Sequence, residues 1–181
     1  MRIVAGFSSM EEESEKGWGG GMEPDLTLVR HLKAKGRFEE AQAQLQQWLA
    51  EDPANPRLLW EMAVLLDNQN KEADAVLYYQ RAIELGLDRM HLADAYLGWG
   101  SSLRVVGRYS ESRQVLERGI AEFPHHAGLK VFHALTLWTL DNYGDAFGEL
   151  LEVIVKTAAD ETLEPYRATL AYYRDHWRDR S

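Results

Sequence analysis

The sequence contains no cysteine. Without a thiol the chain cannot form a disulfide, use a thiolate nucleophile or build a zinc or iron–sulfur site from Cys ligands. Proline is scarce, with 5 in 181 residues, and no apolar run reaches the roughly 18 to 20 residues of a membrane span. These absences predict a soluble, cytoplasmic protein with no membrane partner.

Basic residues are also few, because 20 Lys and Arg stand against 29 Asp and Glu and give a net charge of −9. An acidic surface repels phosphate backbones, so no nucleic acid is expected as a partner. Hydrophobic residues make up 45% of the chain, which is enough for one packed domain or a short repeat array. None of the six histidines belongs to an HExxH motif or an i, i+4 ligand pair, so neither a metal nor a cofactor is expected.

Four similar segments recur along the chain, and their first positions are 34, 37 and 34 residues apart. Each segment lies between two stretches whose apolar residues have helical spacing. Such a period predicts four helical hairpins. The segments are Gly36-Arg37-Phe38-Glu39-Glu40-Ala41, Asn70-Lys71-Glu72-Ala73-Asp74-Ala75, Gly107-Arg108-Tyr109-Ser110-Glu111-Ser112 and Asp141-Asn142-Tyr143-Gly144-Asp145-Ala146.

The period of 34, with its turn residue, aromatic, small residue and a proline such as Pro53 or Pro124, resembles the tetratricopeptide repeat over about residues 22 to 158. More narrowly, the stretches around residues 78–87, 96–104 and 121–124 resemble the small bacterial group 5 tetratricopeptide proteins. The resemblance implies an all-α, right-handed superhelix, or α-solenoid, that binds a protein or peptide. Gly119 departs from the repeat, which usually has alanine there. The small residues of segment 98–102 are expected to allow close backbone packing between neighbouring hairpins, and not to form a phosphate loop.

The domain organisation follows from these units. Residues 1–21 are expected to be a disordered leader, and a G-rich codon tract before Met22 suggests that translation naturally starts there. The hairpins are expected at about residues 22–55, 56–89, 90–126 and 127–160. Residues 161–181 are expected to form a capping helix and tail, with Asp160 as N-cap. A rival interpretation makes its apolar stripe a docking surface: Leu163, Tyr166, Leu170, Tyr173 and Trp177.

The candidate binding site is the concave groove that the first helix of each hairpin lines in tetratricopeptide proteins. Its rows are mostly apolar, which predicts a hydrophobic ligand, and Arg104 is expected to pair with an acidic group. Trp60, Glu61 and Val64 stand where carboxylate-clamp domains have Lys, Asn or Arg, so that ligand class is not expected. The predicted groove residues are Arg57, Trp60, Glu61, Val64, Leu97, Ser101, Arg104, Val131, Phe132, Leu135 and Trp138.

The sequence therefore predicts a non-catalytic module that binds an unidentified protein or peptide in the groove. Two alternatives stay open. The groove residues could pack only against one another, with the chain self-associating as a scaffold through its aromatic C-terminal helix. Catalysis would need His133, expected as a hydrogen-bonded core residue, to lie beside a carboxylate in an open pocket. His125 and His126 are expected in solvent, in the turn after Pro124.

Overall fold

The computed structural model describes residues 24–159 and 161–176, and nine α-helices lie in these ranges. Eight of the helices form four antiparallel hairpins, followed by a short 3₁₀ helix and a ninth helix. The predicted leader, the N-cap Asp160 and Trp177 lie outside the described residues. The helices are α1 (Leu26–Ala34), α2 (Phe38–Glu51), α3 (Pro56–Asn68), α4 (Glu72–Glu84), α5 (Arg89–Val105), α6 (Tyr109–Glu122), α7 (Ala127–Thr139), α8 (Tyr143–Thr157), η1 (Glu161–Tyr166) and α9 (Arg167–His176).

The turn inside each hairpin explains the residue that opens each repeated segment. Gly36, Asn70, Gly107 and Asp141 all have positive φ, at 70°, 57°, 83° and 60°. This left-handed conformation is open to glycine and tolerated by Asn and Asp. In all four turns the amide after this residue donates to the carbonyl five residues earlier, for example Arg37 N–H to Leu32 O at 2.9 Å. The recurring sequence is therefore a recurring helix C-cap.

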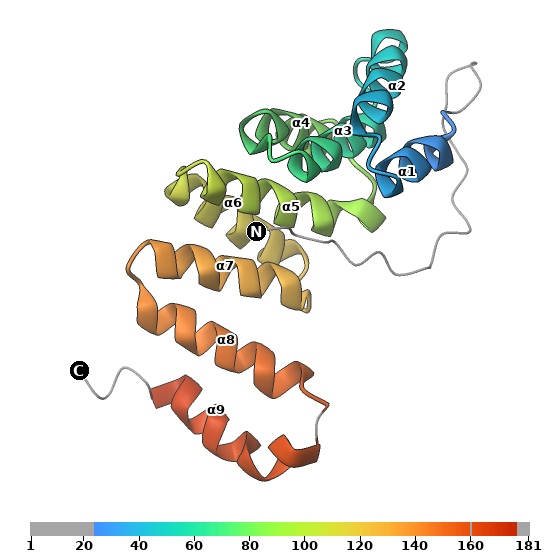
Figure 1. The fold of residues 1–181 in the computed structure, drawn as a ribbon. Coiled ribbons are helices and arrows are strands. Elements are labelled where there is room, and N and C mark those ends of the chain that lie inside the picture. Colours follow the sequence, from blue (N-terminus) through green and yellow to red (C-terminus); the bar gives the residue numbers. More distant parts are fainter. Residues whose placement is uncertain (1–23, 160, 177–181) are drawn as a thin grey trace.

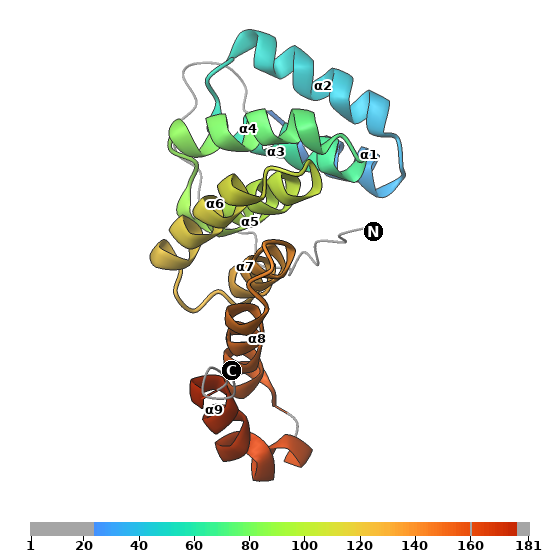
Figure 2. The ribbon, with the colours of Figure 1, turned by 90° about the vertical axis from the view of Figure 1, so that its left-hand side faces the viewer.

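The hairpins stack in chain order into an all-α repeat superhelix (Figure 1). In Figure 2, α7, α8 and α9 follow one another below α5 and α6. One continuous core runs from Val29 in α1 to Leu129 in α7, and a smaller core joins Ala134 and Leu137 to Ala146. Among the described helices, none is both long and apolar enough to cross a membrane.

Three helical glycines lie against large side chains, and Gly98 among them confirms the prediction of close packing between neighbouring hairpins. A Cβ on Gly98 would lie 2.5 Å from the Tyr79 ring of the preceding hairpin, and one on Gly100 would lie 2.4 Å from Leu116 Cγ. Gly119 stands where the repeat usually has alanine, and a Cβ on it would lie 2.9 Å from the Cβ of Tyr96. The glycine therefore leaves room for Tyr96. Each glycine thus makes space for a large buried neighbour.

The C-terminal segment differs from the single helix predicted from residue 161. Its first six residues form η1, which contains Pro165, and the α-helix begins only at Arg167. Proline lacks the N–H that an α-helix starting at 161 would need at this place. The Arg167 guanidinium donates to the carbonyls of Val155 and Ala158 at the end of α8, and so ties α9 to the last hairpin.

Candidate functional site

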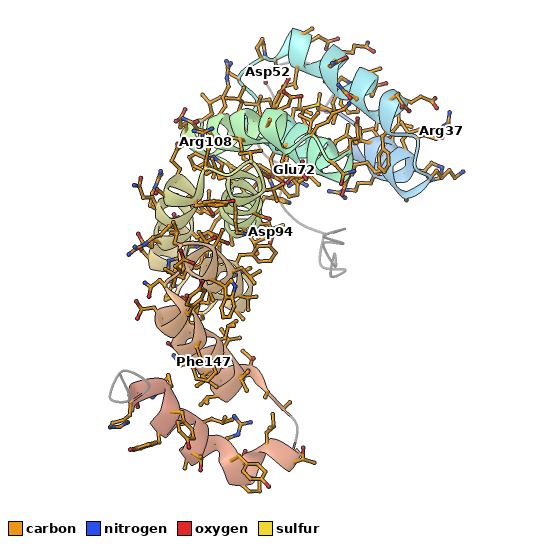
Figure 3. The ribbon with its side chains drawn as sticks, turned by 60° about the vertical axis from the view of Figure 1, so that its left-hand side comes forward. Arg37, Asp52, Glu72, Asp94, Arg108 and Phe147 are labelled. Carbon is orange, nitrogen blue, oxygen red and sulfur yellow. The ribbon has the colours of Figure 1, made fainter. Side chains whose placement is uncertain are left out.

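The array bends, and the first helices of the hairpins face the inside of the bend. In Figure 3, Asp94 at the start of α5 lies on the inner side, while Arg108, in the turn before α6, lies on the outer side. The predicted groove residues come from α3, α5 and α7, the first helices of the second, third and fourth hairpins. Their exposure differs strongly along the array.

The α3 end of the groove is filled by an ion-paired cluster. The Glu61 carboxylate, only 2% exposed, accepts a hydrogen bond from Lys33 Nζ at 2.8 Å and lies 3.6 Å from Arg57 Nη2. The Arg57 guanidinium lies 4.8 Å from the ring centroid of Trp60, whose ring also contacts that of His91 at 4.6 Å. Trp60 and Glu61 are therefore buried at this end of the predicted groove and do not form an exposed binding surface. We call Lys33, Arg57, Trp60, Glu61 and His91 the α3 cluster.

The α5 and α7 part of the groove is more open. Trp138 is 60% exposed and Leu135 is 38% exposed, although both are large and apolar. Ser101 is buried, and the other predicted residues are half-buried, with Val64, Leu97 and Phe132 packed against the main core. We give the name α5–α7 face to the exposed Val105, Leu135 and Trp138 together with the half-buried Arg104 and Val131.

Arg104 is the basic residue of the α5–α7 face. Within residues 24–159 and 161–176 it makes no ion pair within 4 Å, and its buried Nε has no hydrogen-bond partner. The buried Oγ of Ser101, one turn earlier on α5, also has no hydrogen-bond partner among the described residues. Buried polar atoms in native proteins are almost always hydrogen-bonded, so unpaired ones call for an explanation. Trp60 Nε1 in the α3 cluster and His133 Nε2 on α7 are also buried without a hydrogen-bond partner among the described residues.

Behind the groove, a carboxylate joins three helices. Asp67 near the end of α3 accepts hydrogen bonds from Tyr79 Oη on α4 at 2.8 Å and from Ser102 Oγ on α5 at 2.7 Å. Burial raises the pKa of Asp67 to about 6, even though both hydrogen bonds act to lower it. No sequence pattern indicated that Tyr79 and Ser102 would bind this carboxylate.

The raised pKa of Asp67 predicts an unusual pH dependence of stability. The folded state binds this proton more tightly than the unfolded state, whose pKa is near 3.8, so stability falls as pH rises through 6. Lowering the pH from 7 to 4.5 should add about 2 kcal/mol to the free energy of unfolding. Urea unfolding of the wild type and of Asp67→Asn measures this, because the isosteric amide cannot titrate. Parallel pH curves for the two proteins would contradict the assignment.

A second concave feature is an open pocket of about 500 Å³ between α7, α8 and α9. His133 Nδ1 lies 2.7 Å from Glu149 Oε2, which confirms His133 as a hydrogen-bonded, largely buried residue. On the pocket wall, Lys130 and Lys156 contact Glu152 at 2.8 and 2.6 Å and lower its pKa to about 2. The pocket is lined by His133, Leu137, Asp145, Gly148, Glu149, Glu152, Arg174 and Asp175.

This pocket has the feature that would reopen a catalytic interpretation, a histidine beside a carboxylate. Its lining contains no hydroxyl or thiol that the His133–Glu149 pair could activate as a nucleophile. In the part of the chain that the structure describes, no group of three or more His, Cys, Asp or Glu side chains is arranged to hold a metal ion. His126, expected in solvent, is instead half-buried, and its Nδ1 accepts the Leu129 N–H at the start of α7.

Comparisons with known proteins agree with this architecture. A family model described as tetratrico peptide repeat matches residues 56–176. No curated protein sequence matches the chain significantly. Among solved structures, YrrB, described as a TPR protein with an unusual peptide-binding site, is 20% identical with a TM-score of 0.63, over 78% of this chain and 71% of YrrB.

Two further structures have a similar fold. MamA from Desulfovibrio magneticus RS-1 is 18% identical with a TM-score of 0.61, over 84% of this chain and 82% of MamA. PilF from Pseudomonas aeruginosa is 17% identical with a TM-score of 0.63, over 84% of this chain and 68% of PilF. At such low identity these structures show the fold alone.

Proposed function

The chain belongs to the tetratricopeptide repeat family, and on that premise we propose that it is a non-catalytic module of the bacterial cytoplasm whose α5–α7 face binds a peptide segment of another protein. Proteins of this repeat fold are in general interaction modules, and one structural neighbour, YrrB, has a peptide-binding site. The observation that carries the proposal is Arg104, which pairs with no carboxylate among the described residues, on the same face as the exposed Leu135 and Trp138.

The chemistry of the α5–α7 face defines the ligand. Trp138 and Leu135 offer apolar area for one side chain of the peptide, and aromatic and arginine residues are the usual anchors of interfaces. Arg104 can form a charge-assisted hydrogen bond with an acidic group of the peptide. The α3 cluster already satisfies its carboxylate internally, through Lys33 and Arg57. We therefore expect the ligand on the second half of the predicted groove.

A second candidate function is self-association through α9, as a structural scaffold. It is favoured by Tyr172 on α9 and by Tyr166 at the end of η1, both more than half exposed, and by the absence of any buried residue among the described side chains of α9. Trp177, which completed the predicted stripe, lies outside the described residues.

Peptide selection tests the groove proposal. A random peptide library selected on the immobilised full chain should yield peptides that combine an aromatic or aliphatic residue with an acidic one. Arg104→Ala and Trp138→Ala should each weaken binding of a selected peptide about tenfold or more, measured by fluorescence anisotropy. Leu77→Ala is the matched control. Leu77 is 64% exposed on α4, which is the second helix of its hairpin and not part of the predicted groove. The Leu77→Ala protein should therefore bind the peptide like the wild type. Selected peptides that bind both groove variants like the wild type would discard the proposal.

A further inference from the structure

The first helices of the four hairpins carry one row of residues at the same place in the repeat. Each member lies three positions before the turn residue with positive φ, and each is the last but one residue of its helix. The row therefore marks equivalent points on neighbouring hairpins. We call it the end row, and its members are Lys33 on α1, Asp67 on α3, Arg104 on α5 and Trp138 on α7.

The first two members of the end row have their partners within the chain. Lys33 Nζ donates a hydrogen bond to the buried Glu61 carboxylate at 2.8 Å. The Asp67 carboxylate accepts hydrogen bonds from Tyr79 Oη at 2.8 Å and from Ser102 Oγ at 2.7 Å. This half of the row is therefore occupied by contacts that hold the hairpins together, and it offers no free group to a ligand.

The last two members of the end row are available to a ligand. Arg104 makes no ion pair within 4 Å among the described residues. Trp138 is 60% exposed, and Leu135, one turn before it on α7, is 38% exposed. The third hairpin thus presents one anchor for an anion, and the fourth presents one anchor for an apolar side chain.

The repeat geometry sets the distance between these two anchors. Helices α5 and α7 lie side by side (Figure 1), and a Cβ on Gly128 of α7 would lie 3.0 Å from Leu97 Cδ1 of α5. The axes of packed helices are about 8 to 10 Å apart. Because Arg104 and Trp138 occupy equivalent points on the two helices, their anchors are about 10 Å apart or slightly more.

We propose that the α5–α7 face selects an extended peptide whose acidic residue and large apolar residue are three or four positions apart, an inference that rests on the function proposed above. An extended chain advances about 3.3 Å per residue, so three or four residues cover about 10 to 13 Å. Arg104 pairs with the acidic group, and Trp138 and Leu135 receive the apolar side chain. The spacing is the same for either direction of the peptide.

An extended ligand suits this site better than a helical one. A helix advances 1.5 Å per residue, so the two anchors would have to be about seven residues apart along it. Isolated helices shorter than about 12 residues are marginal in water, so such a segment would first have to be ordered. The site is also short, because the end row is closed toward α3 by the contacts of Asp67 and Lys33.

A spacing series tests the motif on the full chain. A peptide selected on the protein is remade with its acidic and apolar residues one, three, four and seven positions apart, and each labelled version is titrated by fluorescence anisotropy. Spacings of three and four should bind about tenfold more tightly than spacings of one and seven, because only they fill both anchors. An optimum at one or seven, or equal binding at all spacings, would overturn the motif.

A proline between the two anchors tests the extended form separately. Proline fits an extended chain and breaks a helix, so a peptide with a spacing of three and one intervening proline should keep its affinity within about threefold. The same peptide with alanine in place of the proline is the matched control. A loss of about tenfold or more with proline and not with alanine would contradict an extended ligand.

Variants of the protein separate failure of the motif from failure of the groove. The preference for three or four positions should disappear in Arg104→Ala and remain in Leu77→Ala. Arg104→Glu should prefer peptides with lysine in place of the acid, at the same spacing; if circular dichroism shows that it unfolds, Arg104→Gln replaces it with the expected loss of the preference. Binding that depends on Arg104 and Trp138 but not on spacing would overturn the motif alone. Binding that depends on neither residue would discard the groove function as well.

Discussion

Gly100→Val is expected to lower the free energy of unfolding by more than about 3 kcal/mol, although glycine is normally the weaker helix former. The reason is Leu116, which is fully buried and has its Cγ only 2.4 Å from where a Cβ on residue 100 would lie. The backbone cannot move away easily, because Gly100 O accepts a hydrogen bond from Ser112 Oγ at 2.7 Å. Urea unfolding followed by circular dichroism measures the change.

The control for this prediction is a double variant in which position 100 becomes larger and position 116 becomes smaller. Leu116→Ala alone should cost about 2 to 5 kcal/mol by leaving a cavity. The double variant Gly100→Val/Leu116→Ala should cost clearly less than the sum of the two single changes, because the added atoms enter the space that Leu116 vacates. Strict additivity would show that contact with Leu116 is not what requires glycine at position 100.

Glu61→Leu is expected to lower the free energy of unfolding by about 3 to 5 kcal/mol. It removes a 2% exposed carboxylate from between Lys33 and Arg57, two cations that would then face each other with little access to water. Because Lys33 belongs to α1, the loss should loosen the first hairpin from the second. Urea unfolding followed by circular dichroism measures the change in the free energy of unfolding.

A surface pair supplies the matched control for Glu61. Glu40 pairs with Arg37 at 2.5 Å, but both side chains are about half exposed. Glu40→Leu should change stability by no more than about 1 kcal/mol, because water screens exposed pairs. If Glu61→Leu cost no more than Glu40→Leu, the α3 cluster would not hold the first two hairpins together in the way described.

The repeat architecture was predictable because its signals are local. The turn residues Gly36, Asn70, Gly107 and Asp141 recur at a spacing that can be counted along the chain. Pro165 was also visible, and it explains why a continuous helix from residue 161 was the wrong expectation.

The closure of the groove was not predictable in the same way. Helical register places Trp60 and Glu61 on the inner side, but their burial depends on Lys33 and His91, which lie in other hairpins. Side-chain pairs between hairpins, like that of Asp67 with Ser102, leave no periodic signal in one sequence. The exposure of Phe147 could not be foreseen either, because it depends on which side of α8 is covered by α9.

The central claim is that Arg104 on the α5–α7 face receives an acidic group of a peptide held by Trp138. The most direct measurement is a double-mutant cycle, in which a selected peptide and its acid-to-amide version are each titrated against the wild type and Arg104→Ala. The account predicts that Arg104→Ala weakens the acidic peptide about tenfold or more and the amide peptide much less, a coupling of roughly 1 kcal/mol or above. Equal weakening of both peptides, or none, would contradict it.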